Sequence, residues 1–178
     1  MACLDETGHP VRARLGTTWA PTGRPPGLKR VGQRREVSRI VALVAPLDGP
    51  GDRARLFARH CRGRIHGEQV LVALRHFRRR IGRPLVVSWD RVNAHRARPV
   101  QAFVAAHPDD YQLEWLPPYA PDLNPEELCT GAVKRDLLNA APSSVDALHR
   151  SARRSFRRLA CRVHQLHRFF HHAGLSVT

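Results

Sequence analysis

Three acidic residues follow apolar or proline-rich segments, where side chains emerge from a folded core. Asp5 follows the short apolar start Met1–Leu4. Asp90 follows the apolar run Leu85–Trp89, and Glu127 comes just after a proline-rich loop. Carboxylates brought together repel one another unless cations lie between them. Mg²⁺ prefers oxygen ligands and keeps several waters, so few carboxylates hold it. Two such ions about 4 Å apart can promote attack on a phosphodiester. The three acids therefore predict metal-dependent chemistry on a phosphate ester, provided that the fold brings them together.

Each acid taken alone also has a structural interpretation. Asn124 is a good helix N-cap and Pro125 a good first helical residue, which places Glu127 at the third helical position. A glutamate there can close a capping box without any catalytic role. An aspartate after a strand, such as Asp90, is often a turn former. Only the convergence of all three would distinguish chemistry from capping.

The elements that must position these acids form a strand-rich first half followed by alternating strands and helices. Strands are expected over Met1–Leu4, Arg12–Ala20, Val37–Ala45, Arg55–His60, Leu85–Trp89 and Tyr111–Leu116. Helices are expected over Glu68–Arg80, Pro99–Ala106, Pro125–Leu138 and Ser144–Phe170, with an extended loop over Pro117–Pro125. This order predicts an α/β fold with a mixed sheet and helices on its faces. In such sheets functional groups gather at the carboxyl ends of strands.

The composition describes one basic domain. The 178 residues carry 30 Lys+Arg against 15 Asp+Glu, a formal charge of +15 with pI near 11.4. A hydrophobic content of 42% suffices for a core, and no apolar run approaches the roughly 18 residues of a membrane span. Such a charge favours a polyanionic partner, most commonly nucleic acid. The bias to Arg over Lys also fits a GC-rich genome. The basic face of Ser144–Phe170 is open to two interpretations, a solvated surface or a line of phosphate contacts.

The cysteines and histidines could form a zinc site, but a row of histidines along one helix face is the favoured interpretation. The four cysteines form no C-x-x-C pair, so reduced thiols are expected. Cys161, His164, His167 and His171 have helical spacing. One helix rarely surrounds a tetrahedral ion, however, and no second ligand pair is evident. A solvated or nucleic-acid-facing stripe is favoured.

The proline-rich loop carries a family resemblance. The stretch Leu116–Glu127, L-P-P-Y-A-P-D-L-N-P-E-E, resembles the signature of mariner-type bacterial insertion-sequence transposases of the DDE superfamily. In that signature the third catalytic acid lies two places after the proline of the Asn-Pro pair, which maps it to Glu127 and not to Glu126. The downstream Val133–Arg135 matches the family's spacing and supports this register.

The other two acids fit the same pattern. The family's second acid follows a buried strand and precedes a histidine by five places, as Asp90 precedes His95. The 36 residues between Asp90 and Glu127 are close to the family's usual spacing. The first acid belongs to an Asp-Glu pair followed by Trp-x-x-x-Gly-x-x-Pro, matched here by Asp5-Glu6 and Trp19–Pro26. With the ending Leu166–Leu175, the resemblance covers nearly the whole chain.

The resemblance implies a ribonuclease H-like fold and an enzyme that cleaves DNA strands and transfers them. Asp5, Asp90 and Glu127 would be the catalytic residues and would hold two Mg²⁺ or Mn²⁺ ions. Asn93 and His95 would orient Asp90 or touch the scissile phosphate.

Lys134 and Arg135 follow about two helical turns after Glu127. They could contact backbone phosphate or simply face solvent. The implied partners are transposon-end DNA, target DNA and a second copy of the chain. The implied location is the cytoplasm, in association with the nucleoid.

Some residues depart from the family pattern. Arg91 replaces the asparagine that often follows the second acid, and Thr130 replaces a tryptophan usual three residues after the third. Asp5 lies so close to Met1 that we expect no N-terminal helix-turn-helix region in this chain. The expected organisation is a catalytic core over residues 1–142, with residues 143–178 as a basic amphipathic helix packed on it. One alternative is an inactive remnant that only binds nucleic acid. A basic RNA-binding protein is another, although aromatics make up only 6% of the residues.

Overall fold

The centre of the computed structural model is a five-stranded mixed sheet. The structure describes residues 1–11, 16–17, 19–24, 27, 36–46, 53–61, 63–118, 120–140 and 142–176. The strands are β1 (Ala2–Pro10), β2 (Glu36–Val44), β3 (Arg55–Cys61), β4 (Leu85–Trp89) and β5 (Tyr111–Trp115), in spatial order β3-β2-β1-β4-β5. Strands β1, β2 and β3 pair antiparallel, while β4 runs parallel to both β1 and β5.

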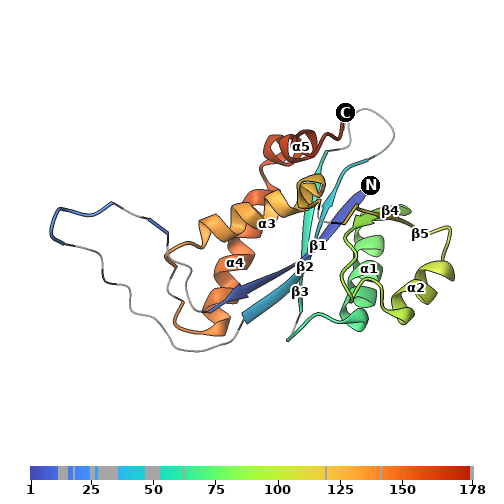
Figure 1. The fold of residues 1–178 in the computed structure, drawn as a ribbon, viewed down its shortest axis with the longest axis horizontal. Helices are drawn as coiled ribbons and strands as arrows, with labels where there is room; N and C mark the ends of the chain where they lie inside the picture. The colour runs from blue at the N-terminus through green and yellow to red at the C-terminus, as the bar shows by residue number, and fades with distance from the viewer. Residues whose placement is uncertain are drawn as a thin grey trace.

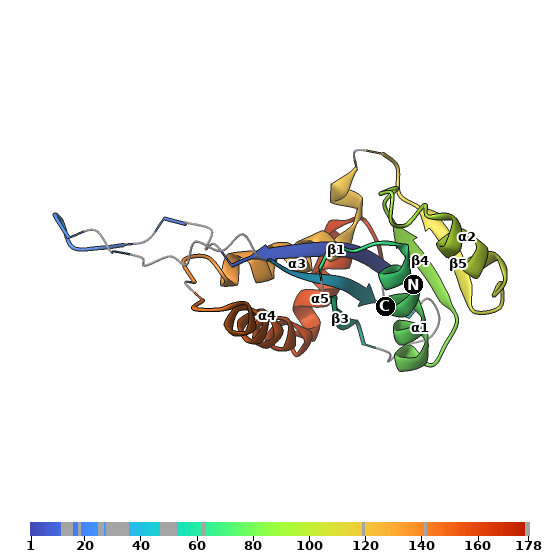
Figure 2. The ribbon, with the colours of Figure 1, turned by 90° about the horizontal axis from the view of Figure 1, so that it is seen from below.

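Helices cover both faces of the sheet. On one side lie α1 (Gly67–Ile81) and α2 (Arg98–Ala105); on the other lie α3 (Pro125–Asp136), α4 (Val145–Ala160) and α5 (Val163–His172) (Figures 1 and 2). A single 3₁₀ turn, η1 (Pro121–Leu123), precedes α3. None of the described helices is long and apolar enough to cross a membrane.

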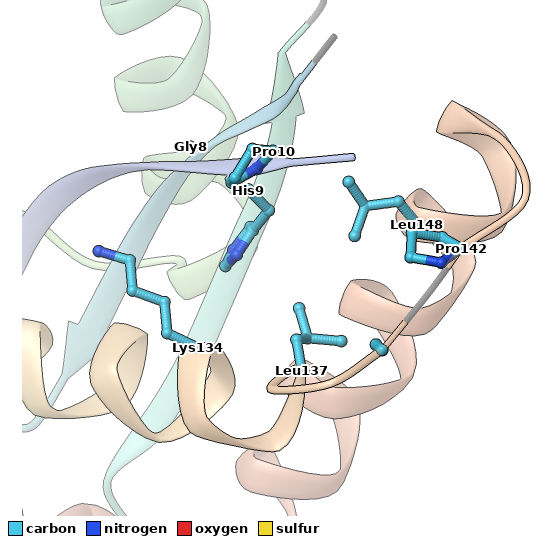
Figure 3. A pocket seen from close by; sticks show the side chains of 8 residues that line it. Gly8, His9, Pro10, Lys134, Leu137, Pro142 and Leu148 are labelled. Carbon is cyan, nitrogen blue, oxygen red and sulfur yellow. The ribbon is translucent and has the colours of Figure 1, made fainter. Parts of the chain in front are cut away.

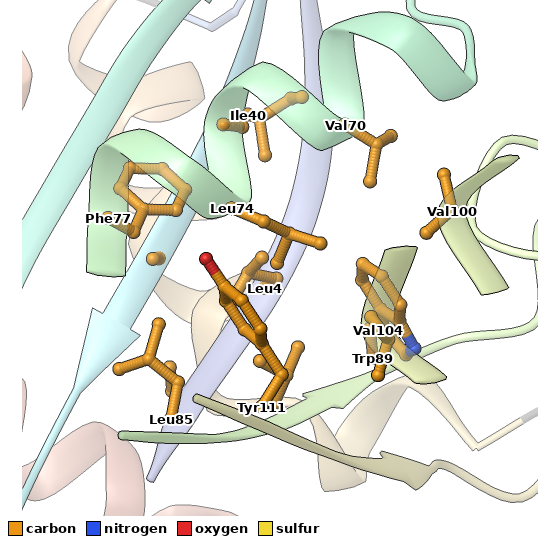
Figure 4. Close-up of a cluster of buried hydrophobic side chains, with 14 of the residues drawn as sticks. Leu4, Ile40, Val70, Leu74, Phe77, Leu85, Trp89, Val100, Val104 and Tyr111 are labelled. Carbon is orange, nitrogen blue, oxygen red and sulfur yellow. The ribbon is translucent and has the colours of Figure 1, made fainter. Parts of the chain in front are cut away.

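Alternation along the strands divides the core between the two faces. Leu4 and Ile40 point toward α1, where they meet Leu74, Phe77 and Trp89 (Figure 4). Their neighbours in sequence, Cys3 and Val41, point the other way. They belong to the opposite cluster, which also includes Phe156, Leu166 and Phe170. Successive side chains of a strand point to opposite faces. The same rule places Asp5 on the α3 side and Glu6 on the α1 side.

Local sequence explains where the helices begin and end. Asn124 caps α3 by accepting the Glu126 N–H, and Pro125 follows as the first helical residue. Ser144 caps α4 by accepting the Ala147 N–H. Gly82 ends α1 in the left-handed region, with φ of 79°, and donates to the Arg78 carbonyl.

Most of the predicted elements are present, and two predictions are wrong. The first strand does not end at Leu4, because it continues through Asp5 to Pro10 by antiparallel pairing with β2. The single helix predicted over Ser144–Phe170 is two helices that meet at Cys161–Arg162. This break allows Phe156 of α4 and Phe170 of α5 to reach the same core cluster.

The strand predicted over Arg12–Ala20 falls largely outside the described residues. Within it, Gly16–Thr17 and Trp19–Ala20 are described, and they are not in a strand.

Candidate active site

The strand register brings the first two acids together. β1 and β4 run parallel, with Ala2 opposite Val87 and Cys3 opposite Ser88. Continuing this register places Asp5 beside Asp90, the residue directly after β4. Asp5 therefore lies inside a strand, at the level where its neighbouring strand ends. This is the carboxyl edge of β4, where the fold leaves room beside the sheet.

A side-chain tether brings the third acid to the same place. The Asn124 amide donates from Nδ2 to the Leu4 carbonyl at 3.1 Å, while Oδ1 accepts the Glu126 N–H at 3.1 Å. Asn124 thus caps α3 and fixes its first turn against β1, one residue before Asp5. The sequence predicted the capping role only. The tether was missed because its two partners lie 120 positions apart.

The three acids affect one another's protonation. Burial raises the pKa of Asp5 to about 6; the Glu6 N–H opposes that rise, and the charges of Glu127 and Asp90 add to it. Burial also raises the pKa of Glu127; Lys134 opposes this, and Asp90 adds to it. Carboxylates behave this way when burial and their own mutual repulsion outweigh the nearby cations. The structure therefore brings Asp5, Asp90 and Glu127 into one electrostatic cluster.

A buried histidine holds the second acid. The His95 Nδ1 donates to Asp90 Oδ1 at 2.9 Å, and its Nε2 lies 3.4 Å from Glu6 Oε1. Burial alone lowers the pKa of His95, but the bonds to Asp90 and Glu6 raise it to about 9. The same hydrogen bond keeps the pKa of Asp90 below its ordinary value. His95 also stacks on Trp89, with ring centroids 4.3 Å apart. At neutral pH this histidine is a rigid cation between two carboxylates.

The structure separates the two adjacent glutamates of α3. Glu126 is fully buried, and burial raises its pKa well above the ordinary value, assisted by the charge of Asp5. Its Oε1 accepts the Thr130 hydroxyl at 2.6 Å. Glu127 is more exposed and belongs to the acid cluster. Thr130 is thus accommodated as the hydrogen-bond partner of the buried Glu126 carboxyl.

The donor set has the chemistry of a divalent-ion site. Carboxylate oxygens are the preferred ligands of Mg²⁺ and Mn²⁺. Burial and, to a smaller extent, mutual repulsion raise the pKa of Asp5, and a bound cation would offset both effects. Among the described residues, however, no three His, Cys, Asp or Glu side chains converge closely enough to hold an ion. The acids are of the residue type that binds Mg²⁺ or Mn²⁺, but their side chains are not gathered closely enough to coordinate an ion.

The remaining predicted site residues lie around the cluster. Asn93 is exposed in the turn after β4, and Arg135 is exposed on α3. Lys134 rises from α3 toward β1 and lines a cavity of about 20 Å³ together with His9 and Leu137 (Figure 3). That volume admits about one water, so it is not a substrate pocket. Lys134 instead acts on the site through its charge, which lowers the pKa of Glu127.

Comparison with known proteins identifies the family and the fold. Residues 1–149 match the family of DDE superfamily endonucleases. No curated protein sequence matches the chain.

Among solved structures, the mariner Mos1 paired-end complex with Mg is similar, with TM-score 0.62 and 14% identity over 97% of this chain and 53% of that one. The Mos1 transposase paired-end complex with the left transposon end has a TM-score of 0.59 and 13% identity, over 98% of this chain and 55% of that one. The simian T-cell lymphotropic virus intasome, in complex with a PP2A regulatory subunit, has a TM-score of 0.51 and 17% identity, over 82% of this chain and 52% of that one. The chain spans about half the length of each. The predicted ribonuclease H-like fold is confirmed.

Proposed function

The chain belongs to the DDE superfamily endonucleases, and we propose that it is a transposase catalytic domain that cleaves DNA strands and transfers them. The observation that supports this most is that the strand register sets Asp5 beside Asp90, while the charge of Glu127, at the start of α3, also raises the pKa of Asp5. Residues 1–142 would form the catalytic core, with α4 and α5 packed on it.

In this proposal the three carboxylates would hold two Mg²⁺ or Mn²⁺ ions. Bound divalent ions supply activation of the attacking hydroxyl and stabilisation of the leaving oxygen in phosphodiester cleavage. The protein's own residues prepare the site. Asn124 fixes the distance between α3 and β1, while His95 holds Asp90 in one orientation and keeps it ionised. His95 acts through Asp90 and is a positioning residue.

The DNA contacts belong to the same proposal. Asn93, three residues after Asp90, and Arg135, on α3, are both exposed and would contact backbone phosphate. Lys134 lies closer to β1 and balances the charge of Glu127. The similar Mos1 structures are paired-end and strand-transfer complexes. We therefore propose transposon-end DNA, target DNA and a second copy as partners, and a cytoplasmic location at the nucleoid.

Nicking of a supercoiled plasmid in Mg²⁺ tests the function. Wild type should convert supercoiled DNA to the open circle, and Asp90→Asn should not. Asp109→Asn is the matched control, because Asp109 is exposed in the turn before β5, at the other end of the neighbouring strand. Equal nicking by wild type and Asp90→Asn, or equal loss in the two variants, would refute the proposal.

A further inference from the structure

A second charged site lies at the edge of the sheet away from the acids. A cleft of about 600 Å³ runs along the edge strand β3, between α1 and α4. Arginines from four elements line it: Arg39 of β2, Arg59 of β3, Arg80 of α1, and Arg153 and Arg157 of α4. The lining residues that the structure describes include no aspartate or glutamate. The cleft thus concentrates positive charge without internal compensation.

Arg39 is the most informative residue of the cleft. Only 2% of it is exposed, although it carries a charge. Its Nη2 donates to the His149 carbonyl at 3.1 Å, and its guanidinium lies over the Phe156 ring, 5.6 Å from the centroid. Its Nη1 is buried without a hydrogen-bond partner in the described part of the chain. A buried charge with an unused donor is costly unless a ligand completes it. An anion in the cleft would supply an acceptor for this donor and would also balance the charge.

The arginines act on the titratable groups that line the cleft, in addition to the effect of burial. Burial lowers the pKa of Arg39 to about 10, and the charge of Arg153 adds to that effect. Burial also lowers the pKa of His149, with further contributions from Arg39 and Arg153 that outweigh the opposing Asp146. His76, on the opposite wall, has its pKa lowered by burial and then by Arg59, Arg80 and, least, Arg79. The field therefore spans the cleft from α1 to α4.

We infer that this cleft is a second DNA-binding site, which holds the phosphodiester backbone of a segment other than the one at the acids. The identification of the anion as DNA rests on the proposed function. Guanidinium groups bind phosphate oxygens in a bidentate way, and arginines on facing walls suit a chain of phosphates. Strand transfer joins two DNA segments, and the cleft lies two strands away from the acids on β1.

Protection of the sheet edge does not explain the cleft. Charged side chains on an edge strand prevent pairing with other sheets, and Arg59 of β3 can serve that purpose. Arg39 cannot, because it lies on the inner strand β2 and is buried. Arg80, Arg153 and Arg157 belong to helices and present no strand edge. Anion binding accounts for all five arginines together.

Two double variants of α4 test the inference, and each of them removes two positive charges. Arg153→Ala with Arg157→Ala removes two cleft arginines, whereas Arg150→Ala with Arg154→Ala removes two exposed arginines of the same helix outside the cleft. Binding to a fluorescein-labelled DNA duplex is measured by anisotropy in EDTA, over a range of salt concentrations. We expect about tenfold weaker binding for the cleft pair and a salt slope reduced by about 2, against less than about twofold for the control pair.

A second matched pair probes the opposite wall. Arg80→Ala should weaken DNA binding more than its neighbour Arg79→Ala, because of the two only Arg80 lines the cleft and Arg79 acts there through its charge alone. Thermal melting confirms that every variant is folded. Equal losses in cleft and control variants would overturn the inference, because binding would then follow net charge alone. Loss of binding to a single-stranded RNA probe without loss of DNA binding would also overturn it.

The measurement is independent of catalysis because EDTA removes divalent ions. If Asp90→Asn still nicked plasmid while the cleft pair alone lost DNA binding, the proposed function would fail and the cleft would stand. If Asp90→Asn abolished nicking while the cleft and control pairs bound DNA equally, the cleft would fail and the proposed function would stand.

Discussion

The sheet carries two clusters of like charge, and they respond to burial in opposite directions. At β1 and β4 the carboxyls of Asp5 and Glu127 have raised pKa values. At the β3 edge Arg39 and His149 have lowered ones. In both places burial is the largest cause, and a like charge adds to it. Neither cluster contains enough opposite charge to balance itself.

This symmetry indicates what each region binds. A cluster of like charges destabilises the folded protein until a ligand of opposite charge arrives. Divalent cations would reduce the repulsion among the acids, and phosphates would reduce the repulsion among the arginines. The two regions also differ in rigidity of support. Asn124 and His95 hold the acids by side-chain hydrogen bonds, whereas most of the cleft arginines extend from α1, α4 and the edge strand. We read the first as a catalytic arrangement and the second as a binding surface.

The largest expected effect separates the two regions by chemistry. Asp5→Asn should reduce Mg²⁺-dependent plasmid nicking by about a thousandfold, because metal-ion catalysis contributes several kcal/mol. The same variant should bind a DNA duplex in EDTA at least as well as wild type, since it removes a negative charge. Gel quantification of open circles gives the first result and anisotropy the second. Undiminished nicking would remove Asp5 from the acid site.

Trp89 tests how far the acid region depends on its packing. This side chain is fully buried at the end of β4 and stacks on His95. Trp89→Ala should lower the free energy of unfolding by about 3–5 kcal/mol, through lost burial and the cavity that remains. Urea denaturation followed by circular dichroism measures it. A loss below about 1 kcal/mol would show that His95 and Asp90 are held by something other than this packing.

Divalent ions should stabilise through the acids and not through the cleft. With Mn²⁺ about a hundredfold above its Kd, linkage gives roughly 2.7 kcal/mol, or about 5–10 °C in Tm for a chain of this size. Asp5→Asn should lose most of this shift. Arg153→Ala with Arg157→Ala should retain it. A shift that persists in Asp5→Asn would place the ion elsewhere.

The smallest expected effect concerns the cost of the buried arginine. Arg39→Met keeps an unbranched side chain and removes the unbalanced charge, so we expect stability to change little or to rise by about 1 kcal/mol. Urea midpoints measure it. A loss of more than about 2 kcal/mol would mean that Arg39 is a structural residue whose charge is already satisfied.

Much of the fold follows from periodicity. Strands β2, β4 and β5 and helices α1 and α3 agree with their predicted ranges to within two residues, since their apolar patterns and turn residues are local signals. The break between α4 and α5 has no such signal. No glycine or proline marks Cys161–Arg162, and the apolar spacing continues through it. Only the shared core beneath the two helices requires the turn.

The sites are predictable to different degrees. Asp90 is a candidate from sequence because it directly follows an apolar strand, and Glu127 because the loop before it resembles the family signature. The link from His95 to Glu6 could not, because it depends on which face of β1 each residue occupies. One residue in the sequence could have indicated the cleft. Arg39 interrupts an otherwise apolar run, V-S-R-I-V, in a strand that was expected to be buried.

The adjacent glutamates of α3 provide the most direct test of the central claim. Glu127→Gln and Glu126→Gln make the same chemical change one residue apart, so they differ only in which carboxyl is lost. Glu126 is fully buried, and glutamine can still accept the Thr130 hydroxyl, so its variant should nick plasmid in Mg²⁺ within a few-fold of wild type. Glu127→Gln should leave no nicking above background. Full activity in Glu127→Gln, or its loss in Glu126→Gln alone, would contradict the account.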